Sequence, residues 1–418
     1  MTPQPHTNDR VGGGDHADRN SAARLPLEGV RIIELANIVA GPSVGKHLSD
    51  FGAEVIKVER PGDGDTARTM GESLGDRSAW WLSLGRNKKA ITLDLRHPEG
   101  REIMLRLVRQ ADALVESFRP GVLERLNLSP DVLLAENPRL VVIRVSGFGQ
   151  TGPYSHRPGF GTLAEAYSGY SAISGFEDRP PLLAPTALAD EVSGLFATWA
   201  LMVALYGRDV RGLPGQTIDV SLFESIFGIL GPLPALFQHT GYLQSRNGSR
   251  LPFSSPRNVY RTRDGAYYAI SGTAPAAAER VIEVVGGEEL LADPRFRTHE
   301  ARAEHADELD EIVADWMAGH DVDEIEALFE AAAAAGIRIM SMKEIFDDPH
   351  YAARESFVRV PDDELGDVAM AAPVPRFSIT PGRIEHTGSR LGSDTQALLS
   401  ELCYEQAEID RMRSEGVW

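Results

Sequence analysis

Two adjacent carboxylates, Asp190 and Glu191, stand near the start of residues 183–207, which otherwise carry no charge and read as a buried helix. Asp190 suits a helix N-cap, because an aspartate there accepts hydrogen bonds from unpaired backbone N–H groups, worth about 1 kcal/mol. It equally suits a nucleophile, since a helix N-terminus favours the ionised carboxylate and apolar surroundings solvate it poorly. Glu191 points about 100° away on a helix and is predicted to be solvated or capping. The sequence leaves both interpretations of Asp190 open.

Cations follow several predicted strands, and each alone also suits a solvated surface charge. Arg60 follows strand 53–59, and Arg86, Lys88, Lys89 and Arg96 lie around strand 90–95. Arg119 lies beside Phe118 at the end of strand 112–118, and Arg125 lies beyond it. Such grouping is unusual in a chain with a formal net charge of -19. Guanidinium groups bind phosphates bidentately and stack on adenine, so the grouping favours a ligand with several phosphates and an adenine.

The elements that must position these residues alternate between strand and helix. The pattern predicts strands at 30–36, 53–59, 90–95, 112–118 and 140–149, and helices within 41–52 and 98–111. It also predicts a helical stretch from about 190 to 240 that is interrupted by "RGLPGQ" at 211–216. This alternation predicts an α/β fold with an open, Rossmann-like parallel sheet. Ligands of such sheets bind beyond the carboxyl ends of the strands, so we expect binding at turns that start at Asn37, Arg60, Phe118 and Gly147.

The chain is predicted to divide into two domains and a tail. Residues 1–24 are polar and Gly-rich, which predicts a disordered tail. Residues 258–272 predict a β-hairpin that turns at Asp264-Gly265. We expect a smaller α+β domain at 245–345, and a large domain at 25–244 to which the chain returns at 346–418.

Composition argues against several classes of function. The acidic balance disfavours nucleic acid or an anionic membrane as partner, and the least polar stretch, 192–206, is shorter than the about 20 residues of a membrane span. The one cysteine, Cys403, predicts a reducing, cytoplasmic location. The 11 histidines lack metal-ligand spacing, so no metal site is expected. Dinucleotide, P-loop and serine-hydrolase fingerprints are also missing from the sequence.

Several motifs, taken in order, carry a resemblance to a known family. They are "LEGVRIIELANIVAGPSVGKHLSDFGAEVIKVERPGDGDTAR", "RNKKAITLDLRHPEGR", "LVESFRPGVLERL", "RVSGFGQTGP", "ALADEVSGLFATWALMVAL" and "GQTIDVSLFES". From about residue 27 to its C-terminus the chain resembles the class III CoA-transferases, the family of formyl-CoA:oxalate CoA-transferase, carnitine CoA-transferase and alpha-methylacyl-CoA racemase. The resemblance implies an interlocked homodimer that uses a coenzyme A thioester as substrate and holds no permanent cofactor.

The resemblance also implies roles for individual residues. Asp190 falls on the family's catalytic aspartate, and Glu165 lies where relatives often have glutamine and is a candidate substrate contact. The residues that fall on the family's CoA-binding positions are Val39, Ala40, Arg60, Leu93, Arg96, Ser117, Phe118, Arg119 and Arg125. Independently of the family, Arg257 is a candidate for binding a second carboxylate of the acyl group, and equally suits a surface arginine beside a hairpin.

Three functions follow as alternatives. The first is transfer of CoA from an acyl-CoA to a carboxylic acid through an aspartyl anhydride and an aspartyl-CoA thioester. The second is a 2-methylacyl-CoA racemase or epimerase, which needs an acid and a base at the α-carbon. Phe160 and Gly161 occupy the racemase His-Asp positions, which favours the transferase. The third is a non-catalytic CoA-binding protein in which Asp190 only caps a helix. The segment "NGSRLPFSSPRN" stands in place of a glycine-run loop and does not favour oxalate or formate as substrate.

Overall fold

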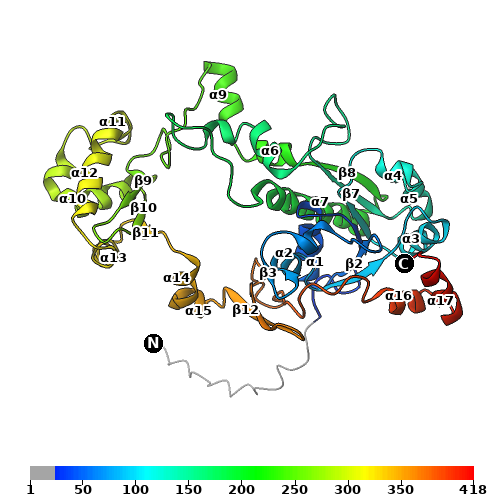
Figure 1. The fold of residues 1–418 in the computed structure, drawn as a ribbon. Helices are drawn as coiled ribbons and strands as arrows, with labels where there is room; N and C mark the ends of the chain where they lie inside the picture. The colour runs from blue at the N-terminus through cyan, green and yellow to red at the C-terminus, as the bar shows by residue number, and fades with distance from the viewer. Residues whose placement is uncertain (1–23) are drawn as a thin grey trace, which may run out of the picture.

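The structure is a computed structural model that describes residues 24–418. The predicted disordered tail, 1–24, therefore lies outside the described residues except for its last position. Figure 1 shows a large unit, which holds both the first described residues and the C-terminus, and a small unit beside it. We use these two names below.

The large unit is built on a six-stranded sheet in which every neighbouring pair is parallel. Its strands are β1 (Arg31–Leu35), β2 (Glu54–Glu59), β5 (Lys88–Thr92), β6 (Ala113–Glu116), β7 (Val141–Ser146) and β8 (Gln216–Ser221). They lie in the order β5-β2-β1-β6-β7-β8, the doubly wound order of Rossmann-type sheets. The predicted α/β fold with a Rossmann-like sheet is therefore confirmed, and its topological switch point lies between β1 and β6.

Helices cover both faces of the sheet, as a parallel sheet requires. The helices α1 (Ala40–Ser49) and α7 (Leu188–Arg211) pack on one face around Ile32, and α3 (Pro98–Arg109) packs on the other around Ile33. Successive side chains of a strand point to opposite faces, so these neighbours belong to separate cores.

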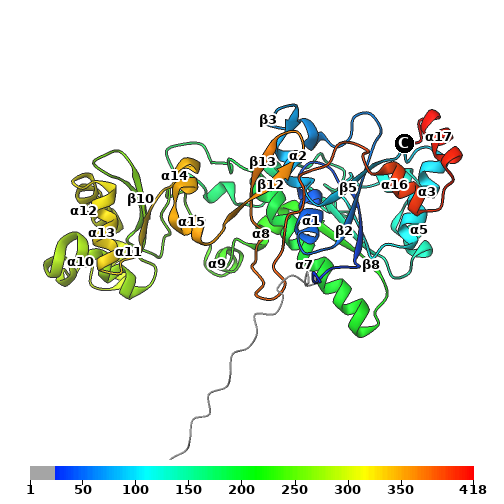
Figure 2. The same cartoon turned by 90° about the horizontal axis from the view of Figure 1, so that it is seen from below.

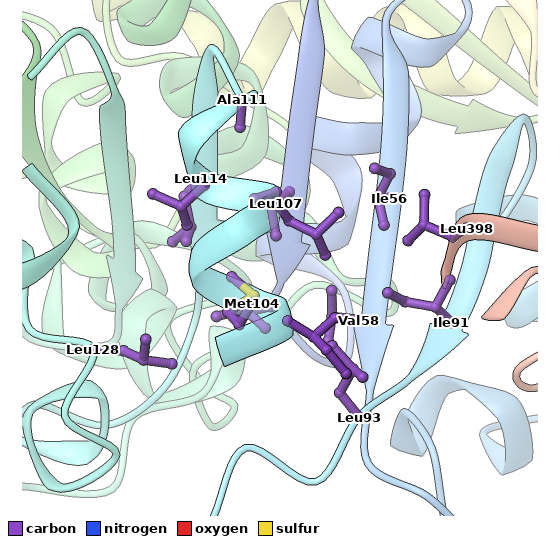
Figure 3. Packing of buried hydrophobic residues seen from close by; sticks show 14 of the residues in the cluster. Ile56, Val58, Ile91, Leu93, Met104, Leu107, Ala111, Leu114, Leu128 and Leu398 are labelled. Carbon is purple, nitrogen blue, oxygen red and sulfur yellow. The ribbon is translucent and has the colours of Figure 1, made fainter. Parts of the chain in front are cut away.

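The C-terminal segment completes the core on the α3 face. Figure 3 shows Leu398 beside Ile56 and Ile91 of the sheet, and all three are buried in one cluster. Leu398 belongs to α16 (Thr395–Glu401), which is followed by α17 (Gln406–Ser414). In Figures 1 and 2 both helices lie next to α3 and α5 (Pro130–Glu136), far from the small unit.

By length and composition alone, helix α7 could cross a membrane. Core helices of soluble proteins pass the same test, so this finding is weak support for a membrane span. Helix α7 packs against α1 closely: a Cβ at Gly194 would stand 2.7 Å from Cβ of Ser43. The predicted helical stretch 190–240 is partly wrong, because residues Gln216–Ser221 form the edge strand β8. In the second part of this strand, Ile218 and Val220 alternate with Asp219 and Ser221, which is the pattern of a half-buried strand.

The small unit combines a three-stranded antiparallel sheet with helices. Its strands β9 (Arg257–Arg261), β10 (Tyr267–Ser271) and β11 (Gly336–Arg338) lie in the order β11-β10-β9. The predicted hairpin is confirmed, and Gly265 in its turn has a φ of 87°, a value that glycine adopts without strain. The helices are α10 (Pro275–Ala292), α11 (His299–Glu304), α12 (Ala306–Ala318) and α13 (Val322–Ala331).

Two connections join the units and run apart in Figure 1, one through α9 (Leu233–Thr240) and residues 241–256, the other through residues 339–356. The second holds α14 (Met342–Asp347) and α15 (Pro349–Ala353) and leads to the hairpin β12 (Phe357–Asp362) and β13 (Gly366–Ala371), which packs near α2. The other elements of the large unit are η1 (Thr66–Thr69), β3 (Ser73–Leu74), β4 (Arg77–Ser78), α2 (Ala79–Leu84), α4 (Val122–Arg125), α5 (Pro130–Glu136), α6 (Gly161–Tyr167), η2 (Ser171–Ile173), α8 (Leu222–Gly228) and α9 (Leu233–Thr240). The limits 245 and 345 of the predicted small domain stay a prediction.

Candidate active site

Asp190 lies in the first turn of α7 and lines a cavity of about 370 Å³. The N-cap of α7 is Ala187, which makes no side-chain capping hydrogen bond, so the interpretation of Asp190 as an N-cap is wrong. The cavity lies at the switch point of the sheet, because Asn37, just after β1, and Ser117, just after β6, line it as well. This is where a doubly wound sheet places its ligand.

The Asp190 side chain packs against the backbone of Gly161, the first residue of α6. A Cβ at Gly161 would overlap with Oδ2 of Asp190. Only glycine leaves room for the carboxylate in this position. The residue that stands in place of the racemase aspartate is thus the one that lets Asp190 turn toward the cavity.

The surroundings of Asp190 disfavour its charge. Burial, followed by the charges of Glu191 and Glu165, raises the pKa of Asp190 to about 6. At neutral pH the group is therefore still mostly ionised, and it is poorly solvated. A carboxylate in that condition is a better nucleophile than one in water.

Glu191 has the opposite environment. Its carboxylate accepts hydrogen bonds from Nζ of Lys46 at 3.0 and 3.1 Å and lies 3.7 Å from Nε2 of His47, both on α1. Burial would raise its pKa, yet these partners lower the pKa to about 2. The sequence predicted that Glu191 is a cap or a solvated charge, and this prediction is wrong. Glu191 is one half of a partly buried ion pair between α7 and α1.

A second cavity, of about 460 Å³, continues from the first across the carboxyl ends of the strands. The two share the lining residues Asn37, Thr66, Phe118 and Val122. The groove formed by both cavities (the switch-point groove) leads from Asp190 to two guanidinium groups. Arg60 pairs there with Asp63, and Arg96 with Asp94 at 3.1 Å.

Seven of the nine predicted CoA contacts line this groove. Ala40, Ser117, Phe118 and Arg119 line the cavity of Asp190, and Arg60, Leu93 and Arg96 line the second. Two do not line it: the side chain of Val39 is buried against Ala67, Trp81 and Leu84, and Arg125 is exposed on α4 outside both cavities.

The two predicted substrate contacts also lie outside the groove. Glu165 is buried, and its Oε2 accepts a hydrogen bond from the backbone N–H of Ala184 at 2.9 Å, so its side chain holds the segment before α7. Arg257 belongs to the small unit, where it lines a separate cavity of about 640 Å³ and donates to the backbone oxygen of Ser249 at 2.6 Å. Within one chain, Arg257 is not brought to Asp190.

A buried network of charges holds the turn after β1. Ile38 has a φ of 71°, unusual for a β-branched residue, and its N–H donates to Oδ1 of Asp65 at 2.9 Å. Nζ of the fully buried Lys57 lies 2.5 Å from Oδ2 of Asp65 and 3.1 Å from Oε1 of Glu34. Against the effect of burial, the charges of Asp65 and Glu34 raise the pKa of Lys57. The ion pairs keep Asn37 and Ile38 at the floor of the groove.

Apart from Phe160, sequence reasoning missed the wall of the cavity formed by residues 155–160. Ser155, Arg157, Gly159 and Phe160 line the cavity of Asp190 and not the second cavity. The guanidinium of Arg157 lies 3.5 Å above the ring of Tyr154. The signal was an arginine and closely spaced glycines between a predicted strand and helix. No cluster of three or more metal-ligating side chains was found among residues 24–418.

The model of CoA-transferase family III matches residues 27–395. The chain belongs to CoA-transferase family III. The resemblance drawn from the motifs and the enzyme class that it implied, an acyl-CoA:carboxylate CoA-transferase, are therefore confirmed.

Relatives of this CoA-transferase match it over most of their length. Succinyl-CoA--D-citramalate CoA-transferase of Chloroflexus aurantiacus is 42% identical over 90% of this chain and 94% of its own. Succinyl-CoA:glutarate CoA-transferase of Mus musculus is 32% identical over 94% and 90%, respectively. The crystal structure of a CAIB/BAIF family protein from Brucella suis superposes with a TM-score of 0.80 at 31% identity, over 91% of this chain and 100% of that one.

Proposed function

We propose that this enzyme transfers CoA from a dicarboxylic acyl-CoA, with succinyl-CoA as the donor, to a second carboxylic acid, and that Asp190 is the nucleophile. One observation carries the proposal: Asp190, with its raised pKa, faces a groove that continues to Arg60 and Arg96. The relatives named above use succinyl-CoA according to their names, which supports this donor.

The first half-reaction converts Asp190 into a thioester. A carboxylate oxygen attacks the thioester carbonyl of the donor, the carbon–sulfur bond breaks, and an aspartyl–acyl anhydride and CoA thiolate result. The thiolate then attacks the carbonyl carbon of Asp190, which releases the donor acid as a carboxylate and leaves an aspartyl-CoA thioester. In the second half-reaction the acceptor carboxylate attacks this thioester, which frees the thiolate and forms a new anhydride. The thiolate then attacks the acceptor carbonyl, the carbon–oxygen bond to Asp190 breaks, and the acceptor acyl-CoA and the Asp190 carboxylate result. Each step exchanges one activated carbonyl for another, so the sequence closes without ATP or a proton carrier.

The groove supplies binding energy remote from the reacting atoms. Phe118 lines both cavities and lies where a ligand must pass from the cations to Asp190. The ion pairs of Arg60 and Arg96 are exposed and contribute little, so phosphate groups can replace their carboxylates. Contacts to the nucleotide end then hold the thioester against Asp190, which favours the transition state through positioning.

We also propose the interlocked homodimer that the resemblance implies. Because two separate connections join the units, the chain follows the ring-like course that such a dimer needs (Figure 1). An apolar stripe along α7 is exposed in the single chain, with Leu195, Trp199, Val203, Tyr206 and Val210 each more than half exposed. Contiguous exposed apolar surface is typical of protein interfaces. Mass photometry or light scattering tests the proposal, and a monomer would contradict it. A cytoplasmic location is likewise proposed, on the single cysteine Cys403.

Mass spectrometry tests the covalent route. Wild-type protein incubated with succinyl-CoA is expected to carry CoA on Asp190, whereas Asp190→Ala is expected to lose transfer and still bind CoA. Wild-type turnover by Asp190→Ala would remove the mechanism. The racemase alternative predicts deuterium exchange at the α-carbon without an acceptor acid, and Phe160, which lines the cavity, supplies neither acid nor base.

A further inference from the structure

Two guanidinium groups, those of Arg119 and Arg157, line the cavity that contains Asp190. Within residues 24–418 neither lies within 4.0 Å of a carboxylate oxygen, whereas Arg60 and Arg96 in the second cavity are both paired. The cavity thus has cations available for a ligand, and its catalytic carboxylate stands near two further acidic residues. An anionic acyl group could approach Asp190 only beside a cation.

The two arginines belong to different segments of the chain that line this cavity. Arg119 directly follows Phe118, which lines both cavities, so Arg119 stands where the groove continues toward the nucleotide end. Arg157 belongs to residues 155–160, which line only the cavity of Asp190. This segment runs into Gly161, against which Asp190 packs, so the Cα atoms of Arg157 and Gly161 are at most about 14 Å apart. Arg157 therefore serves the acyl side of the site.

Aromatic rings hold Arg157 in place without using its hydrogen-bond donors. The guanidinium lies 3.5 Å above the ring of Tyr154, which contacts Phe148 and Tyr167 with ring centroids 6.3 and 5.9 Å away. Stacking on a ring face leaves the N–H groups of a guanidinium free in their plane. The N–H groups of Arg157 are thus available to donate two parallel hydrogen bonds, the arrangement that a carboxylate accepts best.

We propose that Arg157 binds the second carboxylate of a dicarboxylic acyl group and thereby selects such acyl-CoA thioesters over monocarboxylic ones. The proposal rests on the proposed function, since it places the acyl chain between Asp190 and Arg157. A monocarboxylic chain offers no partner for the guanidinium, and sites built for a polar group reject ligands that lack it. Arg257, which the sequence suggested for this role, lies in another cavity.

Donor pairs that differ only in the distal group provide the test. Succinyl-CoA and butyryl-CoA have the same chain length, with a carboxylate in one and a methyl group in the other. For Arg157→Gln we expect kcat/KM with succinyl-CoA to fall roughly 100-fold and that with butyryl-CoA to change less than about 3-fold. Arg157→Lys is expected to restore part of the loss. Free succinate as a competitive inhibitor gives a second readout, in which Arg157→Gln raises the Ki of succinate and leaves that of CoA unchanged.

Two variants serve as comparisons. Arg179 also stacks on an aromatic ring, with its guanidinium 5.4 Å from the centroid of Phe176, and does not line the groove. Arg179→Gln is expected to change neither donor. Arg257→Gln is expected to behave in the same way.

Several results would overturn the proposal. An equal loss with both donors in Arg157→Gln would assign the residue to CoA binding or to folding, and no loss would remove its role. A succinate-selective loss in Arg257→Gln would place the second carboxylate there. The proposed function fails separately, if wild-type protein forms no CoA adduct on Asp190 with any donor. An adduct in Arg157→Gln from butyryl-CoA would show that the nucleophile is intact.

Discussion

Replacing Asp190 by asparagine should stabilise the folded protein while it abolishes transfer. The pKa of Asp190 is raised from 3.8 to about 6, chiefly by burial, so the folded state disfavours its charge. One pKa unit corresponds to about 1.4 kcal/mol, and a shift of about two units therefore sets an upper limit of about 3 kcal/mol. Asparagine keeps the size and removes the charge, so we expect the free energy of unfolding to rise by about 1–3 kcal/mol at pH 7.5.

The gain must depend on pH with a definite sign. Below the unfolded pKa of 3.8 the carboxyl is protonated in both states, and asparagine has no advantage. Between pH 3.8 and about 6 the unfolded carboxyl ionises first, so the wild type loses stability relative to the variant. Above about pH 6 the difference is constant, and at pH 5 we expect about half of it. Urea unfolding at pH 5.0 and 7.5, at one protein concentration, measures both values.

Glu191→Gln is the matched control, because the adjacent carboxylate has the opposite shift. Its pKa is lowered to about 2 through Lys46 and His47, so removal of the charge should destabilise the protein. The side chain is 34% exposed, and solvent screening limits the loss to about 1 kcal/mol. If Asp190→Asn is no more stable than the wild type at pH 7.5, or if its advantage does not grow from pH 5.0 to 7.5, the carboxylate is not held in a costly environment and the reasoning is wrong.

Three further predictions concern activity. The kcat/KM for the acyl-CoA donor should fall below about pH 6, since only ionised Asp190 attacks; an acid limb near pH 4 would contradict the raised pKa. Gly161→Ala should lower kcat at least 100-fold by displacing the Asp190 carboxylate, while the CoA affinity measured by calorimetry stays within about 3-fold of wild type. Full activity would exclude the close approach of the Asp190 carboxylate to Gly161. Asp65→Asn should raise the KM for acyl-CoA roughly 10-fold with little change in kcat, because Ile38 and Lys57 lose a charged partner that holds the floor of the groove. A lower kcat at unchanged KM, in protein with a native circular dichroism spectrum, would assign Asp65 another role.

The periodicity of the chain was sufficient to predict the sheet, because buried parallel strands are short apolar runs. Strands 30–36 and 53–59 and helix 98–111 appear in the structure as β1, β2 and α3. The edge strand β8 was missed, since half of its side chains face solvent and its pattern is weaker. The hairpin at Asp264-Gly265 was predictable from two residues, because a tight turn makes local demands that few residue types meet.

The site was predictable only in part, and the predictions that failed for individual residues have a common cause. Val39 and Ala40 are neighbours in the chain, yet only Ala40 lines the cavity, because the backbone at this turn directs the Val39 side chain into the core. Arg157 was overlooked for the complementary reason. Its place in the lining of the Asp190 cavity depends on the contact between Gly161 and Asp190 at the start of α7, which no local pattern records.

The sequence by itself determined the alternation of strands and helices and the family, and it suggested the nucleophile that we propose, because these depend on residue types at short spacing. Only the tertiary structure decided which charges meet. Asp190, Arg60, Arg96 and Arg157 come from different strand and helix ends, and their separation depends on the order β5-β2-β1-β6-β7-β8. The raised pKa of Asp190 likewise arises from the burial created when α6, α7 and the strand ends pack together, since desolvation is a property of the assembled surroundings and not of the residue.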